Sequence, residues 1–300
     1  MAASTVNNST PEKFFRLVYT NPPTGMALIP AGPFLMGNAI GDGDITDANP
    51  TNVYVSAFFM DTNLVSLNIW QAVYTYATIF NGYGFDNVGA GKAANHPVQN
   101  VNWFDCVKWC NASSQLAGLT PVYYTDTALT LVYINGDLTP YVNWSANGYR
   151  LPTEAEWEKA ARGGLSGRRF PWGNLISEGQ ANYLANTNSY SYDRGPNGYN
   201  SIGSIGGTSP ATSPVGSFDV NGYGLYDMAG NVFEWCWDWY GAPYGQPTIT
   251  NPTGPGTGSY RVLRGGGWYN VAFSLRCSQR FPDVPDNAYY NIGFRCVRGL

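Results

Sequence analysis

Strong helical periodicity is confined to two short stretches of this 300-residue chain, and its scarcity restricts the possible folds more than any other feature. The first stretch covers residues 102–116, where Asn102 can cap the helix and Gly118 can end it. The second begins at Thr153, which has the spacing of a capping box with Glu156. The sequence therefore predicts two main helices in a chain that is otherwise built from strands and loops.

Short strands and long loops are expected to make up the rest of the chain. Runs of β-branched and aromatic residues bounded by turn residues predict strands. These runs cover residues 26–37, 53–60, 233–239, 261–266 and 292–298. A weaker helical pattern covers residues 67–79, and residues 174–220 look irregular. With 36 glycines to permit unusual backbone angles, the predicted class is α+β, with two main helices, short twisted strands and much irregular loop.

The charge of the chain excludes some functional classes. Its formal net charge is −4 and only 12% of its residues are charged, so it lacks the basic patch that nucleic acids require. A single histidine, His96, leaves too few ligands for a multi-histidine metal site or for catalysis built on a histidine base. No run of residues reaches the apolar length of a membrane span, so any membrane contact would depend on a lipid anchor outside this chain.

The composition of the chain changes near its start. Residues 1–20 contain an Asn-, Ser- and Thr-rich stretch that is typical of a disordered tether. Residues 21–300 contain no internal repeat and no low-complexity linker. We therefore expect a single domain over residues 21–300.

Six motifs occur in order along the chain. They are MALIPAGPFLMG at 26–37, HPV at 96–98 with VNWFD at 101–105, RLPTEAEWE at 150–158, FPWG at 170–173, NGYGLYDMAGNVFEW at 221–235 and GFR at 293–295. Together they resemble the formylglycine-generating-enzyme, or sulfatase-modifying-factor, superfamily over residues 26–298. This resemblance implies a C-type-lectin-like fold with much irregular structure.

The enzymes of this superfamily oxidise a sulfatase cysteine with a reactive cysteine pair that holds copper, and soft thiolates suit Cu(I). The matching stretch here, residues 264–276, contains no cysteine, and Cys277 follows it at a position that looks structural. A related branch uses histidine-bound iron, for which His96 alone is insufficient. We therefore expect neither a catalytic site nor a catalytic cofactor, with an enzyme of the superfamily as the alternative.

The C-terminal residues 268–291 instead resemble the variable region of proteins diversified by retroelements, which have this fold and place a hypermutated segment there. The resemblance implies a ligand-display protein at a bacterial cell surface or in the extracellular space, with an unknown protein or surface ligand as its partner. Arg276, Arg280, Pro285 and Gly293 look fixed between the variable positions. The expected ligand-binding positions are Tyr269, Asn270, Val271, Phe273, Ser274, Leu275, Phe281, Asp283, Val284, Asp286, Tyr289, Tyr290 and Asn291.

The composition of this segment suits recognition. Tyrosine and phenylalanine offer a large contact area at low entropic cost, and serine and asparagine offer adaptable hydrogen bonds. The alternative is that Tyr269, Phe273, Tyr289 and Tyr290 are core aromatic residues. Aromatic residues among polar neighbours, without the alternation of a strand, favour an exposed surface.

The resemblance also implies a structural ion. In the enzymes, the positions that match Asp227, Gly230, Val232 and Glu234 bind Ca²⁺ through two side-chain and two carbonyl oxygens, which suit a hard cation. The alternative is that Asp227 caps a turn and Glu234 pairs with an arginine. The sequence leaves both interpretations open.

Two further sets of residues have a structural interpretation. Cys110 and Cys296 match positions that the enzymes join by a disulfide, and the alternative is two buried thiols. Glu154, Glu156 and Glu158 lie around the start of the second helix. We expect them to be solvated or to cap the helix, and the alternative is a catalytic carboxylate pair.

Overall fold

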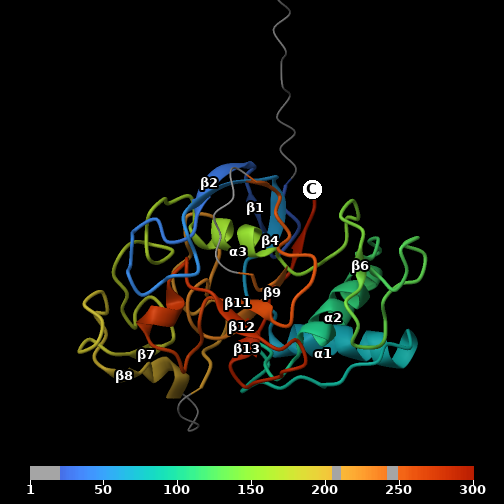
Figure 1. Ribbon diagram of the computed structural model, residues 1–300. Coiled ribbons are helices and arrows are strands. Elements are labelled where there is room, and N and C mark those ends of the chain that lie inside the picture. The colour runs from blue at the N-terminus through green and yellow to red at the C-terminus, as the bar shows by residue number, and fades with distance from the viewer. Residues whose placement is uncertain (1–20, 205–210, 242–248) are drawn as a thin grey trace, which may run out of the picture.

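The computed structural model describes residues 21–204, 211–241 and 249–300. These residues confirm the predicted α+β class, because they contain three α-helices among many short strands and irregular connections (Figure 1). The helices are α1 (Leu67–Thr75), continued by a π-helical turn η1 (Tyr76–Phe80), α2 (Trp103–Leu116) and α3 (Glu154–Ala161). The weaker helical pattern over residues 67–79 is thus confirmed. The predicted tether, residues 1–20, lies outside the described residues.

The two main helices begin where their capping residues predict. The side chain of Asn102 accepts a hydrogen bond from the backbone N–H of Asp105 at 2.7 Å, and Gly118 follows α2 with a φ of 66°. Thr153 Oγ1 accepts from the N–H of Glu156 at 3.2 Å, and Glu156 Oε2 accepts from the N–H of Thr153 at 2.8 Å. These contacts satisfy backbone donors that a first turn leaves unpaired. In the described parts of the chain, no helix is long and apolar enough to cross a membrane.

A four-stranded sheet, in the order β12–β11–β9–β13, lies at the centre of the described structure (Figure 1). Its strands are β9 (Phe233–Trp239), β11 (Arg261–Arg264), β12 (Phe281–Asp283) and β13 (Ile292–Gly293). Successive strand residues point to opposite faces of a sheet. Phe233, Trp235 and Trp237 accordingly pack into the cluster that contains α2, whereas Cys236 packs into the cluster that contains α3. Hydrophobic side chains therefore cover both faces of β9.

Two three-stranded sheets and two strand pairs accompany the central sheet. One sheet contains β1 (Met26–Ile29), β4 (Phe58–Asp61) and β14 (Val297–Arg298), and the other contains β2 (Gly32–Met36), β3 (Thr51–Val55) and β10 (Ile249–Thr250). The pairs are β5 (Tyr123–Tyr124) with β6 (Tyr141–Val142) and β7 (Leu184–Ala185) with β8 (Gly198–Tyr199). Short 3₁₀ turns cover Ser201–Ser204 (η2) and Ala272–Leu275 (η3). Each predicted strand segment overlaps at least one of these strands.

The last strand of the chain joins the first ones. β14 pairs antiparallel with β4, so that Met60 lies opposite both Ala27 of β1 and Val297 of β14. In Figure 1 the C-terminus lies beside β1 and β4, whereas β12 and β13 lie lower in the molecule. The C-terminal residues therefore run from the central sheet to a second sheet that the N-terminal strands build.

Several of the few charged side chains lie inside the protein. Arg264 binds Glu158, whose Oε1 also lies 2.7 Å from Arg162 Nη2, and Arg280 binds Glu154 through two hydrogen bonds of 2.7 Å. The expectation that Glu154 and Glu158 are solvated is therefore wrong, whereas Glu156 does cap α3. Breaking such a pair would leave a buried charge uncompensated, so the pairs hold irregular segments in place.

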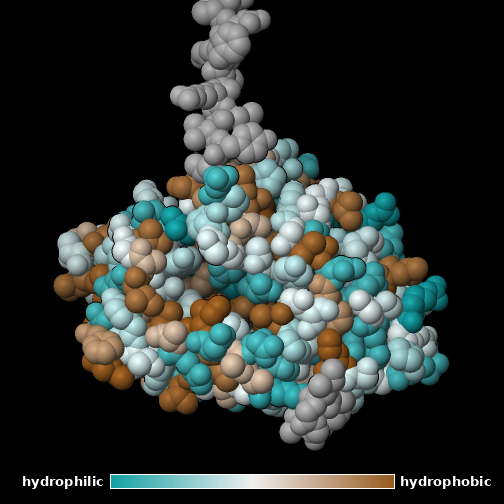
Figure 2. Space-filling view, turned by 180° about the vertical axis from the view of Figure 1, so that it is seen from behind, coloured by the Kyte–Doolittle hydropathy of each residue, from teal (hydrophilic) through white to brown (hydrophobic). Residues whose placement is uncertain are grey.

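Figure 2 shows the surface at the back, where hydrophobic residues lie in groups between hydrophilic ones.

Candidate ligand-binding surface

Residues 268–291, named the recognition segment from here on, are attached to the rest of the protein through their backbone. The backbone hydrogen bonds between the segment and its surroundings have N–O distances of 2.6–3.0 Å. They include the N–H groups of Leu184, Cys277, Trp103, Asn100 and Phe233, which donate to the carbonyls of Asn270, Arg169, Pro285, Tyr289 and Asn291 respectively. Backbone hydrogen bonds do not depend on side-chain identity, so this attachment tolerates the exchange of side chains.

Arg276 attaches the first half of the recognition segment to an acidic loop. Its guanidinium is buried, and Nη1 lies 2.8 Å from Asp44 Oδ1 and 3.0 Å from Asp42 Oδ2. Its Nε donates to the carbonyl of Phe273 at 3.1 Å. Burial opposes ionisation of Asp42, but hydrogen bonds and charge from Arg169 and Arg276 outweigh it and hold the pKa of that carboxyl below its usual value. Arg276 is therefore a structural residue, which agrees with its fixed appearance in the sequence.

Arg280 attaches the middle of the recognition segment. In addition to Glu154, it binds the carbonyl of Gly241, to which Nη1 donates at 2.7 Å. Arg264 of β11 donates to the carbonyl of Cys277 at 2.9 Å, so a second arginine holds the chain between Arg276 and Arg280. The residues of this stretch are all buried. The stretch therefore belongs to the scaffold.

The other two positions that look fixed in the sequence also have structural roles. The carbonyl of Pro285 accepts a hydrogen bond from the N–H of Trp103, the first residue of α2, at 2.9 Å. Gly293 lies so close to a neighbouring loop that a Cβ there would be 2.5 Å from the carbonyl oxygen of Val98. Any larger residue at this position would force the backbone apart.

The predicted ligand-binding side chains differ in exposure. Tyr269, Tyr290, Tyr289 and Val284 expose 49%, 49%, 47% and 38% of their surface, and Asp286 is also exposed. The half-buried positions are Asn270, Val271, Phe273, Phe281, Asp283 and Asn291. The core alternative is therefore wrong for the three tyrosines. Ligand contact at all of these positions stays a prediction.

Two positions of the predicted surface are buried. Ser274 and Leu275 belong to the 3₁₀ turn η3, and Leu275 packs into a hydrophobic cluster with Phe170 and Ile176. The prediction that Ser274 and Leu275 contact a ligand is therefore wrong. A 3₁₀ turn has three residues per turn, so one side of it faces the core while Phe273 stays half-exposed. The sequence carries no periodic signal that would reveal which residues of so short a turn face inward.

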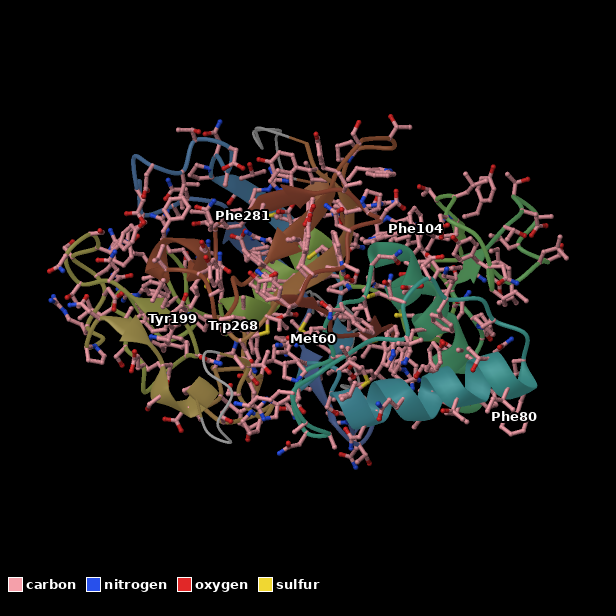
Figure 3. The ribbon with its side chains drawn as sticks, turned by 90° about the horizontal axis from the view of Figure 1, so that it is seen from below. Met60, Phe80, Phe104, Tyr199, Trp268 and Phe281 are labelled. Atoms are coloured by element: carbon pink, nitrogen blue, oxygen red, sulfur yellow. The ribbon has the colours of Figure 1, made fainter. Side chains whose placement is uncertain are left out.

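Two of the exposed tyrosines, Tyr269 and Tyr290, form an aromatic cluster around Trp268. The ring centroids of Tyr269 and Tyr290 lie 5.7 and 5.6 Å from that of Trp268, which is only 9% exposed. Tyr199 of β8, outside the recognition segment, joins the cluster at centroid distances of 6.1 Å to Trp268 and 6.2 Å to Tyr269. Figure 3 shows Tyr199 and Trp268 side by side. Sequence reasoning missed Tyr199, because residues 174–220 show no pattern that assigns a face to any residue.

A second set of rings explains the partial burial of the two phenylalanines. Phe281 packs edge to face against buried Phe233, with centroids 5.0 Å apart, and contacts Phe273 at 6.4 Å. Phe273 in turn lies 6.5 Å from Tyr190, a residue of the same irregular region as Tyr199. These contacts join the recognition segment to the central sheet on one side and to a neighbouring loop on the other.

Comparison with protein families decides which group of proteins shares this architecture. The model of the sulfatase-modifying factor enzyme 1-like domain matches residues 14–300. The chain belongs to this family. The formylglycine-generating enzyme of Bos taurus is 32% identical over 92% of this chain and 75% of its own length. That of Streptomyces coelicolor is 33% identical over 91% of this chain and 88% of its own length.

Solved structures of this sulfatase-modifying-factor type confirm the C-type-lectin-like fold. Treponema denticola variable protein 1 matches with a TM-score of 0.71 and 30% identity, over 92% of this chain and 95% of that one. The structure of CarF matches with a TM-score of 0.66 and 26% identity, over 93% and 99% of the two chains. The similar proteins therefore include some that are named as enzymes and one that is named as a variable protein.

The five cysteines of this family member are buried free thiols. The sulfur atoms of Cys110 and Cys296 lie 3.5 Å apart in one apolar cluster, so the two residues are neighbours as the resemblance implies. The predicted disulfide is nevertheless not formed, and the alternative of two buried thiols describes the structure. Burial raises the pKa of Cys277 to about 11, so little of this thiol is ionised at neutral pH.

The positions that were predicted to bind Ca²⁺ lie on the turn that leads into β9 and at its start. Asp227, with a φ of 53°, accepts a backbone hydrogen bond of 2.8 Å through Oδ2, while its buried Oδ1 has no partner among the described residues. Both oxygens of Glu234 bind Arg295, at 2.7 and 3.0 Å, as the alternative predicts. Burial raises the pKa of Asp227 to about 6, and the charge of Glu234 adds to this. The orphaned oxygen fits a hard cation, and participation of the carbonyls of Gly230 and Val232 stays a prediction.

Proposed function

We propose that this protein binds ligands through a diversified surface, which the recognition segment presents on a rigid lectin-like scaffold. The observation that supports the proposal most strongly is the separation of two roles within residues 268–291. Arg276, Arg280 and the backbone hydrogen bonds attach the segment, whereas the side chains of its three exposed tyrosines contribute none of these hydrogen bonds or ion pairs. Side chains on the surface can therefore change while the attachment is kept.

The chemistry of the surface favours a protein or another broad surface as the ligand. Half-exposed tyrosines supply both apolar area and a hydroxyl group, and asparagines beside them supply amide donors and acceptors. Tyrosine is enriched in protein interfaces because it has few rotatable bonds for the area that it buries. The surface therefore suits recognition more than it suits a chemical reaction.

The enzymatic alternative lacks the residues on which the related enzymes depend. Residues 264–276 contain no cysteine at the place where those enzymes carry the reactive pair. Cys277, the nearest thiol in the sequence, is buried with a pKa of about 11, whereas a reactive cysteine needs a thiolate at neutral pH. Family membership is compatible with both functions, because the relatives include proteins named as enzymes and one named as a variable protein.

The protein would then belong to a system that diversifies the recognition segment with a retroelement and displays it on a bacterial surface. The similarity to Treponema denticola variable protein 1 supports this part of the proposal. Sequencing the encoding locus tests it. An adjacent near-copy of the coding sequence for the segment and a gene for a reverse transcriptase are expected, and a locus without both would contradict diversification.

A display library tests binding directly. Positions 269, 284, 289 and 290 are randomised, and binders are selected against hen lysozyme, ubiquitin and maltose-binding protein. We expect binders with a Kd of about 10⁻⁶ M or lower, and serine at a selected position should weaken binding at least about fivefold. Tyr141→Ser is a matched control, since Tyr141 is equally exposed, at 49%, but lies in β6.

Two outcomes would contradict the proposal. A library that yields no binder, or binders whose affinity survives serine at every selected position, would mean that this surface does not recognise ligands. Incubation with a cysteine-containing sulfatase peptide tests the alternative. Formation of an aldehyde in that peptide, detected by mass spectrometry, would support an enzyme instead.

A structural calcium ion at Asp227 is a separate proposal, which the orphaned Oδ1 supports. Binding to the folded state alone would raise the midpoint of thermal unfolding as the calcium concentration increases. We expect about 1 mM CaCl₂ to stabilise the wild type relative to EDTA, and Asp227→Asn to abolish this difference. A wild-type midpoint that is the same with calcium and with EDTA would contradict the site.

A further inference from the structure

A loop outside the recognition segment lies beside its exposed tyrosines. This flanking loop, residues 184–199, begins with β7 and ends with β8. A parallel bridge between Leu184 and Val271 joins it to the recognition segment. At its other end, Tyr199 is 38% exposed and contacts Tyr269. The aromatic surface is therefore built from two parts of the chain, and only one of them belongs to the recognition segment.

The flanking loop holds its shape through its own polar contacts. Asp193 is 1% exposed and accepts three hydrogen bonds. Their donors are the hydroxyl of Tyr183 at 2.6 Å, the N–H of Asn186 at 2.6 Å and the N–H of Gly195 at 2.9 Å. A carboxylate that accepts several hydrogen bonds fixes the backbone around it. These hydrogen bonds use no side chain of the recognition segment, so the backbone of the flanking loop around Asp193 is held independently of it.

Trp268 connects the two parts of the surface. Its ring contacts Tyr199, Tyr269 and Tyr290 at centroid distances of 5.6–6.1 Å. Its indole N–H is buried and has no acceptor among the described residues. An unpaired buried donor is unfavourable, so a bound group that parts these rings and offers an oxygen would gain a hydrogen bond. The aromatic cluster thus contains an unused donor at its base, as well as exposed area at its rim.

We infer that Tyr199 is a constant contact residue, against which a bound protein partner packs whatever the exposed positions of the recognition segment carry. The inference rests on the proposed binding function and extends it to a residue outside the recognition segment. The partner is a folded protein, because the three half-exposed rings of Tyr199, Tyr269 and Tyr290 form an open surface that crosses two chain segments. Such a surface suits a broad interface with an aromatic centre.

The selected binders described above test this inference, because they differ at the randomised positions and share Tyr199. Tyr199→Ser is introduced into one binder for each of the three target proteins, and Kd is measured. We expect a loss of at least about fivefold in all three. Tyr199→Phe, which keeps the ring, should retain most of the affinity, and Tyr141→Ser should leave Kd unchanged. Thermal unfolding of each variant shows that the protein is folded.

The results separate this inference from the function on which it rests. If Tyr199→Ser leaves the Kd of any one binder within twofold of its parent, Tyr199 is not a constant contact and the inference is wrong, although binding itself stands. If Tyr199→Phe weakens binding as much as Tyr199→Ser, ring contact is not the cause and the inference is also wrong. A library without binders would overturn the binding function and this inference together.

Discussion

Two stretches of the recognition segment, residues 276–280 and 284–290, differ in how they are held. The first is buried, and its two arginines bind carboxylates or carbonyls on other parts of the chain. The second exposes Val284, Tyr289 and Tyr290, and carbonyls in this stretch accept hydrogen bonds from other loops. The difference teaches that one segment can be held in the fold by some of its residues while others stay exposed to solvent.

The largest expected change in stability comes from a substitution in the buried stretch, at Arg280. Arg280→Ala removes both 2.7 Å hydrogen bonds from buried Glu154 and leaves it the longer ion pair to Arg264 Nε, at 3.5 Å, so the free energy of unfolding should fall by about 3 kcal/mol. Unfolding in guanidinium chloride measures this change. In the double variant with Glu154→Gln the loss should be smaller than the sum of the single losses. A single-variant loss below about 1 kcal/mol would mean that Arg280 does not anchor the segment.

Leu275→Ala tests where the buried part of the recognition segment ends and its exposed part begins. Leu275 is fully buried, so its truncation should lower the free energy of unfolding by about 2–4 kcal/mol through lost packing and a residual cavity. The same denaturant titration measures it. An unchanged free energy of unfolding would mean that Leu275 lies on the surface, as the sequence suggested. The exposed part of the segment would then extend from Phe273 to Leu275.

The pH dependence of stability should come from the scaffold. Burial, with the charge of Glu154, raises the pKa of Asp238 on β9 from 3.8 to about 8. The folded protein thus keeps a proton that the unfolded chain releases, and stability should fall as the pH rises from about 4 to about 8. One such group contributes up to about 1.4 kcal/mol per pH unit. Asp238→Asn should flatten the curve of unfolding free energy against pH in this window, and an unchanged slope would contradict the assignment.

The smallest effect is expected on the exposed stretch. Tyr289→Ser removes a side chain that is 47% exposed and leaves its carbonyl bonded to the N–H of Asn100. The free energy of unfolding should change by no more than about 0.5 kcal/mol, as for ordinary surface substitutions. A loss comparable to that of Leu275→Ala would show that Tyr289 supports the fold and would remove the contrast between the two stretches.

Local signals in the sequence predicted local structure well. The caps at Asn102 and Thr153 act on donors three residues away, so their patterns are sufficient to find the helix starts. The environment of Glu154 could not be predicted in this way, because its partner Arg280 lies 126 residues further along the chain. Only the folded chain brings these two residues together.

The binding surface was only partly predictable for related reasons. The resemblance pointed to the recognition segment, and the exposure of Tyr269, Tyr289 and Tyr290 agrees with it. The inward side of a single 3₁₀ turn has no sequence signature, so Leu275 was misplaced. Tyr199 was missed because its place beside Tyr269 depends on how two irregular loops pack, and neither loop has a repeating pattern.

β14, which follows the recognition segment in the sequence, completes the sheet that β1 and β4 build. A frameshift or stop codon within the recognition segment would also delete β14, so the defective chain would leave one edge of β4 unpaired and would be open to proteolysis. Single amino-acid exchanges at the exposed positions preserve the reading frame and therefore β14. Folding itself would thus act as quality control, which removes chains interrupted within the segment and retains those that include β14.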